Sequence, residues 1–356
     1  MDNKINKFLV VSIAFILCST QLMGNKDIQW HLALNWKSTL TPLSTPSFKL
    51  AELVRDMTNG KFIIKIDGLE KHNNRTDLFT MVQENSYEMA HTSSADWSDL
   101  DLNTLWFTGI PLGMTTKEQY AWFYYGGGKE YMTKVYEKFD LLSFPGGDLG
   151  TQMGGWFKKE IKTIGDFNAM NVNTTGITSE ILSMHNVKIK KFSTSEINDA
   201  FLSGELDMIS GSSPSMDSKL GFHKVAPYYY TSWNKPASSK QFLVNKKAFE
   251  SLPKNYQAIL TTAMKTVAYD LYYENFYESS QEWDNFKEKF PDITVRTFPL
   301  KVLQEIRRSK ELIFNHYAED NPLFKEIYFH QKEFLKKARE WNQLEEFGYI
   351  NTMNKL

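Results

Sequence analysis

Two polar segments of this chain could bind a ligand. Gln152 lies in the glycine-rich stretch 147–155, where glycines allow close backbone approach, and its amide both donates and accepts hydrogen bonds. The run 210–213 reads Ser-Gly-Ser-Ser and directly follows an expected buried strand, and ligands of open α/β sheets lie outside the carboxyl ends of strands. A backbone cap at Gln152 and a plain turn at 210–213 are the alternatives, and the sequence leaves both open.

Covalent chemistry has no comparable support in the sequence. The motifs of dinucleotide sites, phosphate-binding loops, nucleophile elbows and zinc proteases are all missing. His31 and His91 lie on expected strands and are interpreted as core or hydrogen-bonding residues. Asp96, Asp99 and Asp101 indicate a solvated face, because an oxygen-ligand metal loop needs more ligands and a glycine turn. We therefore expect no enzyme activity and no catalytic residue.

The composition indicates a two-lobed protein without a nucleic-acid partner. The chain has 356 residues, more than the roughly 250–300 that one hydrophobic core supports. Its 41 basic and 42 acidic residues give a net charge of −1, so no strongly charged partner is indicated. The aromatic fraction of 14% suits well-packed cores, and it also suits a binder of small molecules.

Residues 1–24 resemble a secretory signal peptide. A basic beginning precedes the apolar run 8–18, which is shorter than the about 20 residues of a membrane span. Cys18, the only cysteine, lies inside this segment, so without lipidation of Cys18 the mature chain has no disulfide and no thiolate metal site. We expect cleavage near Gly24 and a periplasmic location.

Alternating strand and helix patterns predict an α/β fold with two lobes. A helical stripe separates strand-like alternation at 28–34 and 61–66, which is the order of a parallel sheet. Ser251 and Pro253 are expected to begin a long helix that runs past Phe286 and spans both lobes. The expected organisation is a first part of lobe I at 25–150 with a helix break at 126–128, lobe II at 151–240 with its first strand at 151–157, a return to lobe I with the long spanning helix at 241–299, and a C-terminal helical segment at 300–356.

Several segments match one family of exported receptors in order and spacing. They are 122–128 (WFYYGGG), 152–161 (QMGGWFKKEI), 221–230 (GFHKVAPYYY), 243–246 (LVNK) and 251–257 (SLPKNYQ). Through them the chain resembles the DctP-like solute receptors of tripartite ATP-independent periplasmic (TRAP) transporters, and most of all their 2-oxo-acid-binding branch. The resemblance covers most of the mature chain.

The resemblance implies a fold, a function and partners. The fold would be a two-lobed, periplasmic-binding-protein-like α/β clamp with a long spanning helix and a C-terminal helical tail. The clamp would close on a small organic acid and deliver it to TRAP permease membrane subunits, which an ion gradient drives. The receptor itself would do no chemistry. A homodimer through the C-terminal helix is also implied.

The family's ligand residues are only partly present. Gln152 matches the glutamine that helps to hold a cation in the 2-oxo-acid branch. Asn171 stands where the family has a carboxylate-binding arginine, and an asparagine cannot give the bidentate, charge-assisted grip of a guanidinium. Ser210 and Gly211 stand where the branch has a glutamate and a tryptophan. We therefore expect that the branch's cation is lost and that the protein has no metal or cofactor.

These departures predict a changed pocket on a retained scaffold. We expect a roomier and more neutral pocket that takes a larger, less acidic solute carrying hydroxyl or amide groups. A non-transporting periplasmic protein that binds or signals to a partner protein is the alternative on the same scaffold. The expected ligand-binding residues are Gln152, Asn171, Asn173, Ser210, Gly211, Ser212, Trp97 and Trp156.

Overall fold

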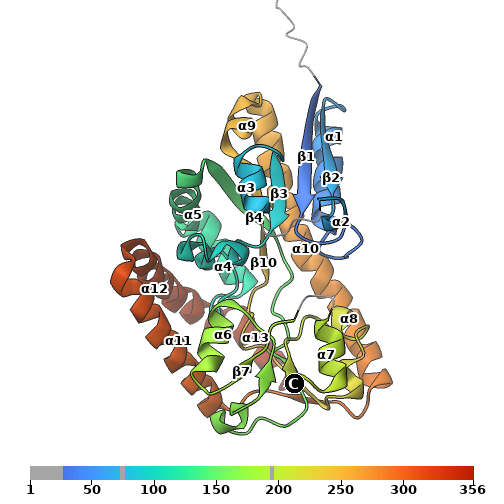
Figure 1. The fold of residues 1–356 in the computed structure, drawn as a ribbon, viewed down its shortest axis with the longest axis vertical. Helices are drawn as coiled ribbons and strands as arrows, with labels where there is room; N and C mark the ends of the chain where they lie inside the picture. Colours follow the sequence, from blue (N-terminus) through green and yellow to red (C-terminus); the bar gives the residue numbers. More distant parts are fainter. Residues whose placement is uncertain (1–26, 73–76, 193–195) are drawn as a thin grey trace, which may run out of the picture.

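Two β-sheets, each containing parallel and antiparallel strand pairs, form with their flanking helices the α/β clamp fold that the sequence predicts (Figure 1). The structure, a computed structural model, describes residues 27–72, 77–192 and 196–356. The expected signal peptide at 1–24 lies outside the described residues. Within the described part, no helix combines the length and the apolar character that a membrane crossing needs.

The first sheet has five strands, which in spatial order are β2 (Phe62–Asp67), β1 (Ile28–Leu34), β3 (Met89–Thr92), β10 (Ser239–Asn245) and β4 (Leu141–Asp148). Strand β1 pairs in parallel with β2 and β3, in agreement with the predicted parallel order. Strand β10 lies antiparallel between β3 and β4. The chain therefore leaves this sheet after β4 and completes it only later, with β10.

The helical segment of the first lobe is broken at the glycines 126–128, as the sequence predicts. Helix α4 (Thr116–Tyr125) ends at Gly126, and α5 (Gly128–Tyr136) follows Gly127, whose φ of 90° lies in the left-handed region that favours glycine. The other helical segments of this lobe are α1 (Thr45–Met57), α2 (Leu69–His72), α3 (Leu78–Gln83), α9 (Lys246–Ser251), and the 3₁₀ turns η1 (Ser94–Trp97), η2 (Leu102–Phe107) and η3 (Glu137–Phe139).

The second sheet has six short strands, which in spatial order are β11 (Thr294–Arg296), β9 (Tyr228–Tyr230), β5 (Gly155–Phe157), β8 (Met208–Ile209), β6 (Asn171–Val172) and β7 (Lys188–Ile189). The strand expected from residue 151 begins only at Gly155. The preceding backbone is used elsewhere, because the Gln152 and Met153 amides donate to the Lys235 and Ser212 carbonyls. The helical segments of this lobe are η4 (Ile164–Phe167), α6 (Gly176–Ser183), α7 (Ile197–Ser203), α8 (Pro214–Asp217) and η5 (Phe222–Lys224).

A long helix joins the two lobes, as the sequence predicts. Helix α10 (Lys254–Lys289) contacts α1 and β4 in the first lobe and α8 in the second, and Figure 1 shows it running from one sheet to the other. Near its end Phe286 packs on Trp156 of the second sheet, with ring centroids 5.9 Å apart. Ser251 belongs to α9 and does not cap α10, which follows Pro253 directly. The lobe boundaries stay a prediction.

The C-terminal segment is a helical hairpin. Helix α11 (Leu300–Asp320) packs on α6 of the second lobe, and α12 (Pro322–Leu344) packs on α11, α4 and η2. Asn321 separates the two helices, since its side chain caps α12 at the Phe324 amide and Pro322 opens the first turn. A last helix, α13 (Glu346–Met353), lies against α12. The hairpin therefore contacts both lobes.

Candidate functional site

A cleft of about 470 Å³ lies between the lobes. The first lobe contributes η1 and the loop after η2, and the second lobe contributes the start of α6. The third wall is the crossing segment 231–238 together with the beginning of β10. Because both lobes and a crossing segment line the cleft, a movement of one lobe toward the other would enclose whatever it holds.

Two lysines give the crossing wall its positive charge. Lys235 and Lys240 both line the cleft, and the Lys240 ammonium donates to Ser238 Oγ at 3.3 Å. The described residues provide no carboxylate in ion-pair contact with either lysine. Loss of hydration lowers the pKa of both ammonium groups, and the charge of Lys235 lowers the pKa of Lys240 further, although Lys235 is exposed and Lys240 is half-buried. An anion in the cleft would oppose this lowering, because it favours the charged form of both groups.

The first-lobe wall carries the opposite charge. Asp96 and Asp99 line it, and both are exposed. The Asp96 carboxylate accepts hydrogen bonds from Asn35 Nδ2 at 2.6 Å and from the Ser93 amide at 3.2 Å. A carboxylate has further acceptor sites, so these groups can take hydrogen bonds from hydroxyl or amino groups. The cleft thus carries charges of both signs on different walls, and the more neutral pocket stays a prediction.

The N-terminus of α6 forms the second-lobe wall. Thr175 is the N-cap residue, but its side chain makes no capping hydrogen bond. Gly176 follows with a φ of 58°, and a β-carbon there would meet nothing within 4 Å. The first amide groups of a helix lack partners within the helix and carry partial positive charge. This open helix start can therefore accept an anionic or carbonyl oxygen.

Gln152 and Ser212 are brought together by the fold, beside the neighbouring strands β5 and β8 of the second sheet. Gln152 is buried, and its Oε1 accepts from Ser212 Oγ at 2.7 Å while its Nε2 donates to the Leu149 and Gly150 carbonyls. Gly211 lies so close to Met153 that a β-carbon would sit 2.8 Å from its carbonyl oxygen. In this arrangement the Gln152 side chain joins residues 149–150 to the loop after β8, and its backbone amide donates to Lys235 of the crossing segment. A ligand contact by these residues stays a prediction.

The Asp217 carboxylate fixes the position of Ser212 and its neighbours. Its buried carboxylate accepts from Tyr229 OH at 2.7 Å, from Trp156 Nε1 at 3.3 Å and from the Ser212 amide at 3.0 Å. Burial raises the pKa of Asp217 to about 6, although these donors oppose the rise. Trp156 itself is fully buried and stacks on Tyr229, with ring centroids 4.2 Å apart. Trp156 thus contributes to the core and orients Asp217.

The remaining predicted ligand residues lie apart from this group of residues. Asn171 donates its backbone amide to Asp207 at 2.8 Å, and its side chain lies 3.4 Å from the same carboxylate. Asn173 donates to the Lys190 carbonyl at 3.1 Å. Trp97, the last residue of η1, is buried against Phe79. Among the predicted ligand residues, therefore, none is a lining residue of the described cleft.

Sequence reasoning missed the lysines of the crossing segment. Lys235 lies between β9 and β10, two strands that belong to different sheets, and Lys240 is the second residue of β10. The signal that could have found them is their position, since a segment between lobes lines the cleft of a clamp. Taken only as residue types in a Ser-rich loop, they look like ordinary solvated lysines.

The described residues leave the expected loss of the cation a prediction. They contain no group of three or more His, Cys, Asp or Glu side chains arranged to hold a metal ion. The Gln152 oxygen, which would be the first ligand, already accepts from Ser212. Calcium takes six to eight oxygen ligands, several of them carboxylates, and Ser210 and Gly211 supply none.

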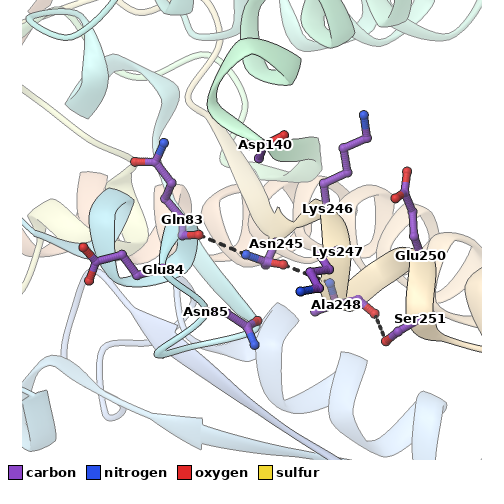
Figure 2. Close-up of a pocket in the computed structure, with 10 residues that line it drawn as sticks. All are labelled: Gln83, Glu84, Asn85, Asp140, Asn245, Lys246, Lys247, Ala248, Glu250 and Ser251. Carbon is purple, nitrogen blue, oxygen red and sulfur yellow. Dashed lines mark hydrogen bonds between the residues drawn. The ribbon is translucent and has the colours of Figure 1, made fainter.

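A larger hollow, of about 660 Å³, lies on the first lobe alone (Figure 2). At its centre the Asn245 side chain accepts from the Ala248 amide at 2.9 Å, so it caps α9. The same side chain donates to the Gln83 carbonyl at 3.2 Å, as Figure 2 shows. These groups fix the ends of helices, and one lobe supplies every wall. We therefore place the candidate site in the inter-lobe cleft.

Comparison with known proteins supports a solute-binding scaffold. The model of the family described as bacterial extracellular solute-binding protein, family 7, matches residues 35–320. A monocarboxylate 2-oxoacid-binding periplasmic protein of Nostoc sp. is 31% identical over 329 residues, which are 92% of this chain and 90% of that protein.

Two crystal structures of TRAP periplasmic solute-binding proteins are similar at 37% identity. The protein from Colwellia psychrerythraea, with bound calcium and pyruvate, superposes with a TM-score of 0.88 and covers 92% of this chain and 100% of its own. The protein from Pseudoalteromonas atlantica, with bound sodium and pyruvate, has a TM-score of 0.86 and covers 92% and 99%.

Proposed function

The chain belongs to the bacterial extracellular solute-binding protein family 7, and we propose that it captures a small organic solute between its lobes as the receptor of a TRAP transporter. The observation that carries the proposal is the cleft, whose walls come from the first lobe, the second lobe and the crossing segment 231–238. A solute held there touches both lobes, so its binding energy favours the closed form. A permease can then distinguish loaded from empty receptor by shape.

The pocket is altered from the 2-oxo-acid type. The relatives from Colwellia and Pseudoalteromonas bind pyruvate together with calcium or sodium. In this chain Asn171, Ser210 and Gly211 replace the expected arginine, glutamate and tryptophan, and we propose that the bound cation is lost with them. Gln152, Asn173, Ser212, Trp97 and Trp156 complete the proposed set of ligand-binding residues, which in the present geometry would act after the lobes close.

The cellular setting follows from the same membership. The family is described as one of extracellular solute-binding proteins, and the relative from Nostoc is described as a periplasmic protein. We propose that 1–24 is removed as a signal peptide and that the mature receptor works in the periplasm with TRAP permease membrane subunits. We further propose that it catalyses no reaction and that the helices after residue 300 pair two copies into a homodimer.

Thermal unfolding of the mature protein against a solute panel tests the receptor function. The panel contains 2-oxo acids, dicarboxylates, hydroxy and sugar acids, neutral sugars and amides, each with and without sodium or calcium. A ligand at 100 times its Kd adds roughly 2.7 kcal/mol, which for a chain of this length raises the Tm by about 4 °C. An organic acid that raises the Tm in EDTA supports the proposal.

Other outcomes of this panel would count against it. A shift with an oxo acid that needs sodium or calcium would contradict the loss of the cation. No shift with any solute would contradict the capture of a small molecule, and it would favour the alternative of a periplasmic protein that binds a partner protein.

A further inference from the structure

We propose that Lys235 and Lys240 are the anion-binding residues of the inter-lobe cleft, so that this receptor holds a carboxylate with two ammonium groups and without a metal ion. The inference rests on the proposed receptor function and names the ligand chemistry of the same site. It concerns the crossing wall, which none of the residues predicted from the sequence occupies.

The first step is that these lysines are available. Lys235 and Lys240 line the same cleft of about 470 Å³, and the described carboxylates make no ion-pair contact with them. Each ammonium group has three donors, and Lys240 donates to Ser238 Oγ. Two like charges that face one cavity repel each other, and an anion between them removes that cost.

The second step is that the nearby carboxylates are satisfied by other donors. Three aspartates act on the lysines at longer range: Asp217 on Lys235, and Asp96 and Asp148 on Lys240. Asp148 is buried and accepts from Thr116 Oγ1, Ser239 Oγ, and the Gly150 and Ser238 amides. Asp217 accepts from Tyr229, Trp156 and Ser212, and Asp96 accepts from Asn35 and Ser93.

These bonds hold the aspartates in fixed positions on the protein. Each of the three accepts hydrogen bonds from neutral side chains or backbone amides. The aspartates therefore offset part of the positive charge of the lysines without forming hydrogen bonds to the ammonium groups. The negative charges of these aspartates favour the charged form of the lysines, and a carboxylate bound in the cleft would favour it further.

The third step is the geometry of closure. The lysines stand on the crossing wall, and the uncapped start of α6 at Thr175 and Gly176 faces the same cleft from the second lobe. A carboxylate held by the lysines can therefore place a further oxygen on the α6 amides when the lobes close. Asp96 and Asp99 on the first-lobe wall can accept hydrogen bonds from hydroxyl or amino groups of the same solute.

Titration calorimetry in EDTA tests the two-lysine site. The titrants are pyruvate, lactate, malate, gluconate, galacturonate and the neutral sugars and amides of the thermal panel, and the proteins are the wild type, Lys235→Gln and Lys240→Gln. Lys247→Gln, an exposed lysine outside the cleft, is the matched control for the loss of one charge. We expect each cleft variant to weaken binding of the acid at least about tenfold, because a charge-assisted bond contributes that much or more, whereas the control keeps the wild-type Kd.

A second measurement separates charge from structure. Lys240→Arg keeps the positive charge and should retain binding within about tenfold, and the melting temperature of every variant reports whether it folds. The expected affinity of the wild type is the same in EDTA and in calcium.

Other results of these titrations would contradict either the two-lysine site alone or the receptor function as well. Binding of an acid that both glutamine variants retain, or that EDTA abolishes, would overturn the two-lysine site while leaving the receptor function intact. Binding of a neutral solute alone would do the same. A wild type that binds none of the acids or neutral solutes would overturn the receptor function and this inference together.

Discussion

Replacing His91 with glutamine tests a buried contact that links the strands of the first sheet. His91 is fully buried on β3, its Nε2 donates to the Gly146 carbonyl at 2.8 Å, and its Nδ1 accepts from Ser47 Oγ at 2.8 Å. The ring also stacks on Phe242, with centroids 4.4 Å apart. This arrangement confirms the interpretation of His91 as a hydrogen-bonding core residue.

The magnitude follows from the protonation of the imidazole. Burial lowers the pKa of His91 from 6.5 to about 3, with Lys240 adding to the effect and the Gly146 bond opposing it. The unfolded chain therefore takes up a proton below pH 6.5 that the folded chain refuses until about pH 3. The contribution of His91 to stability is complete above pH 6.5 and falls by about 1.4 kcal/mol per pH unit below it, or about 2 kcal/mol between pH 7 and pH 5.

The measurement is urea unfolding of wild type and His91→Gln at several pH values from 5 to 7. Glutamine does not titrate, so the stability difference between the two proteins should shrink by about 2 kcal/mol as the pH falls to 5. His316→Gln is the control, because His316 is an exposed residue of α11. Its free energy of unfolding should change with pH in parallel with that of the wild type. A wild-type-minus-variant difference that is the same at pH 5 and pH 7 would refute the reasoning.

Three further predictions concern buried or closely packed residues. Phe286→Ala should lower stability by about 3–5 kcal/mol in urea unfolding, whereas Phe276→Ala on the exposed face of α10 should change it by less than about 0.5 kcal/mol. Gly109→Ala should lower the Tm by several degrees, because its β-carbon would lie 1.8 Å from a backbone carbonyl oxygen of the crossing segment, whereas Gly165→Ala meets only a hydroxyl at 3.5 Å and should leave the Tm unchanged. Asp217→Asn should gain stability relative to wild type by about 2.4 kcal/mol between pH 4 and pH 7, because the raised pKa of about 6 makes the native carboxyl stabilising below pH 4 and costly once it ionises; equal pH profiles of the two proteins in urea unfolding would contradict this.

The sequence by itself determined the elements and the family. Alternation at 28–34, the glycine break at 126–128 and the apolar stripe that continues past Phe286 are local patterns, and the structure contains the corresponding strand, helix ends and spanning helix. The motifs at 152–161 and 221–230 identified the family because they are runs of adjacent residues. The local strand pattern failed at 151–154, where bonds to distant backbone groups replace a sheet ladder.

Only the tertiary structure decided which residues face the cleft. Gln152 has the chemistry of a ligand residue, yet its amide is buried and bonded to Ser212, a partner 60 positions away. Lys235 and Lys240 have the chemistry of surface residues, yet they lie opposite Thr175 in the space between the lobes. The direction of a side chain and its loss of water depend on segments that meet only when both sheets are assembled, so residue type and spacing could not determine them.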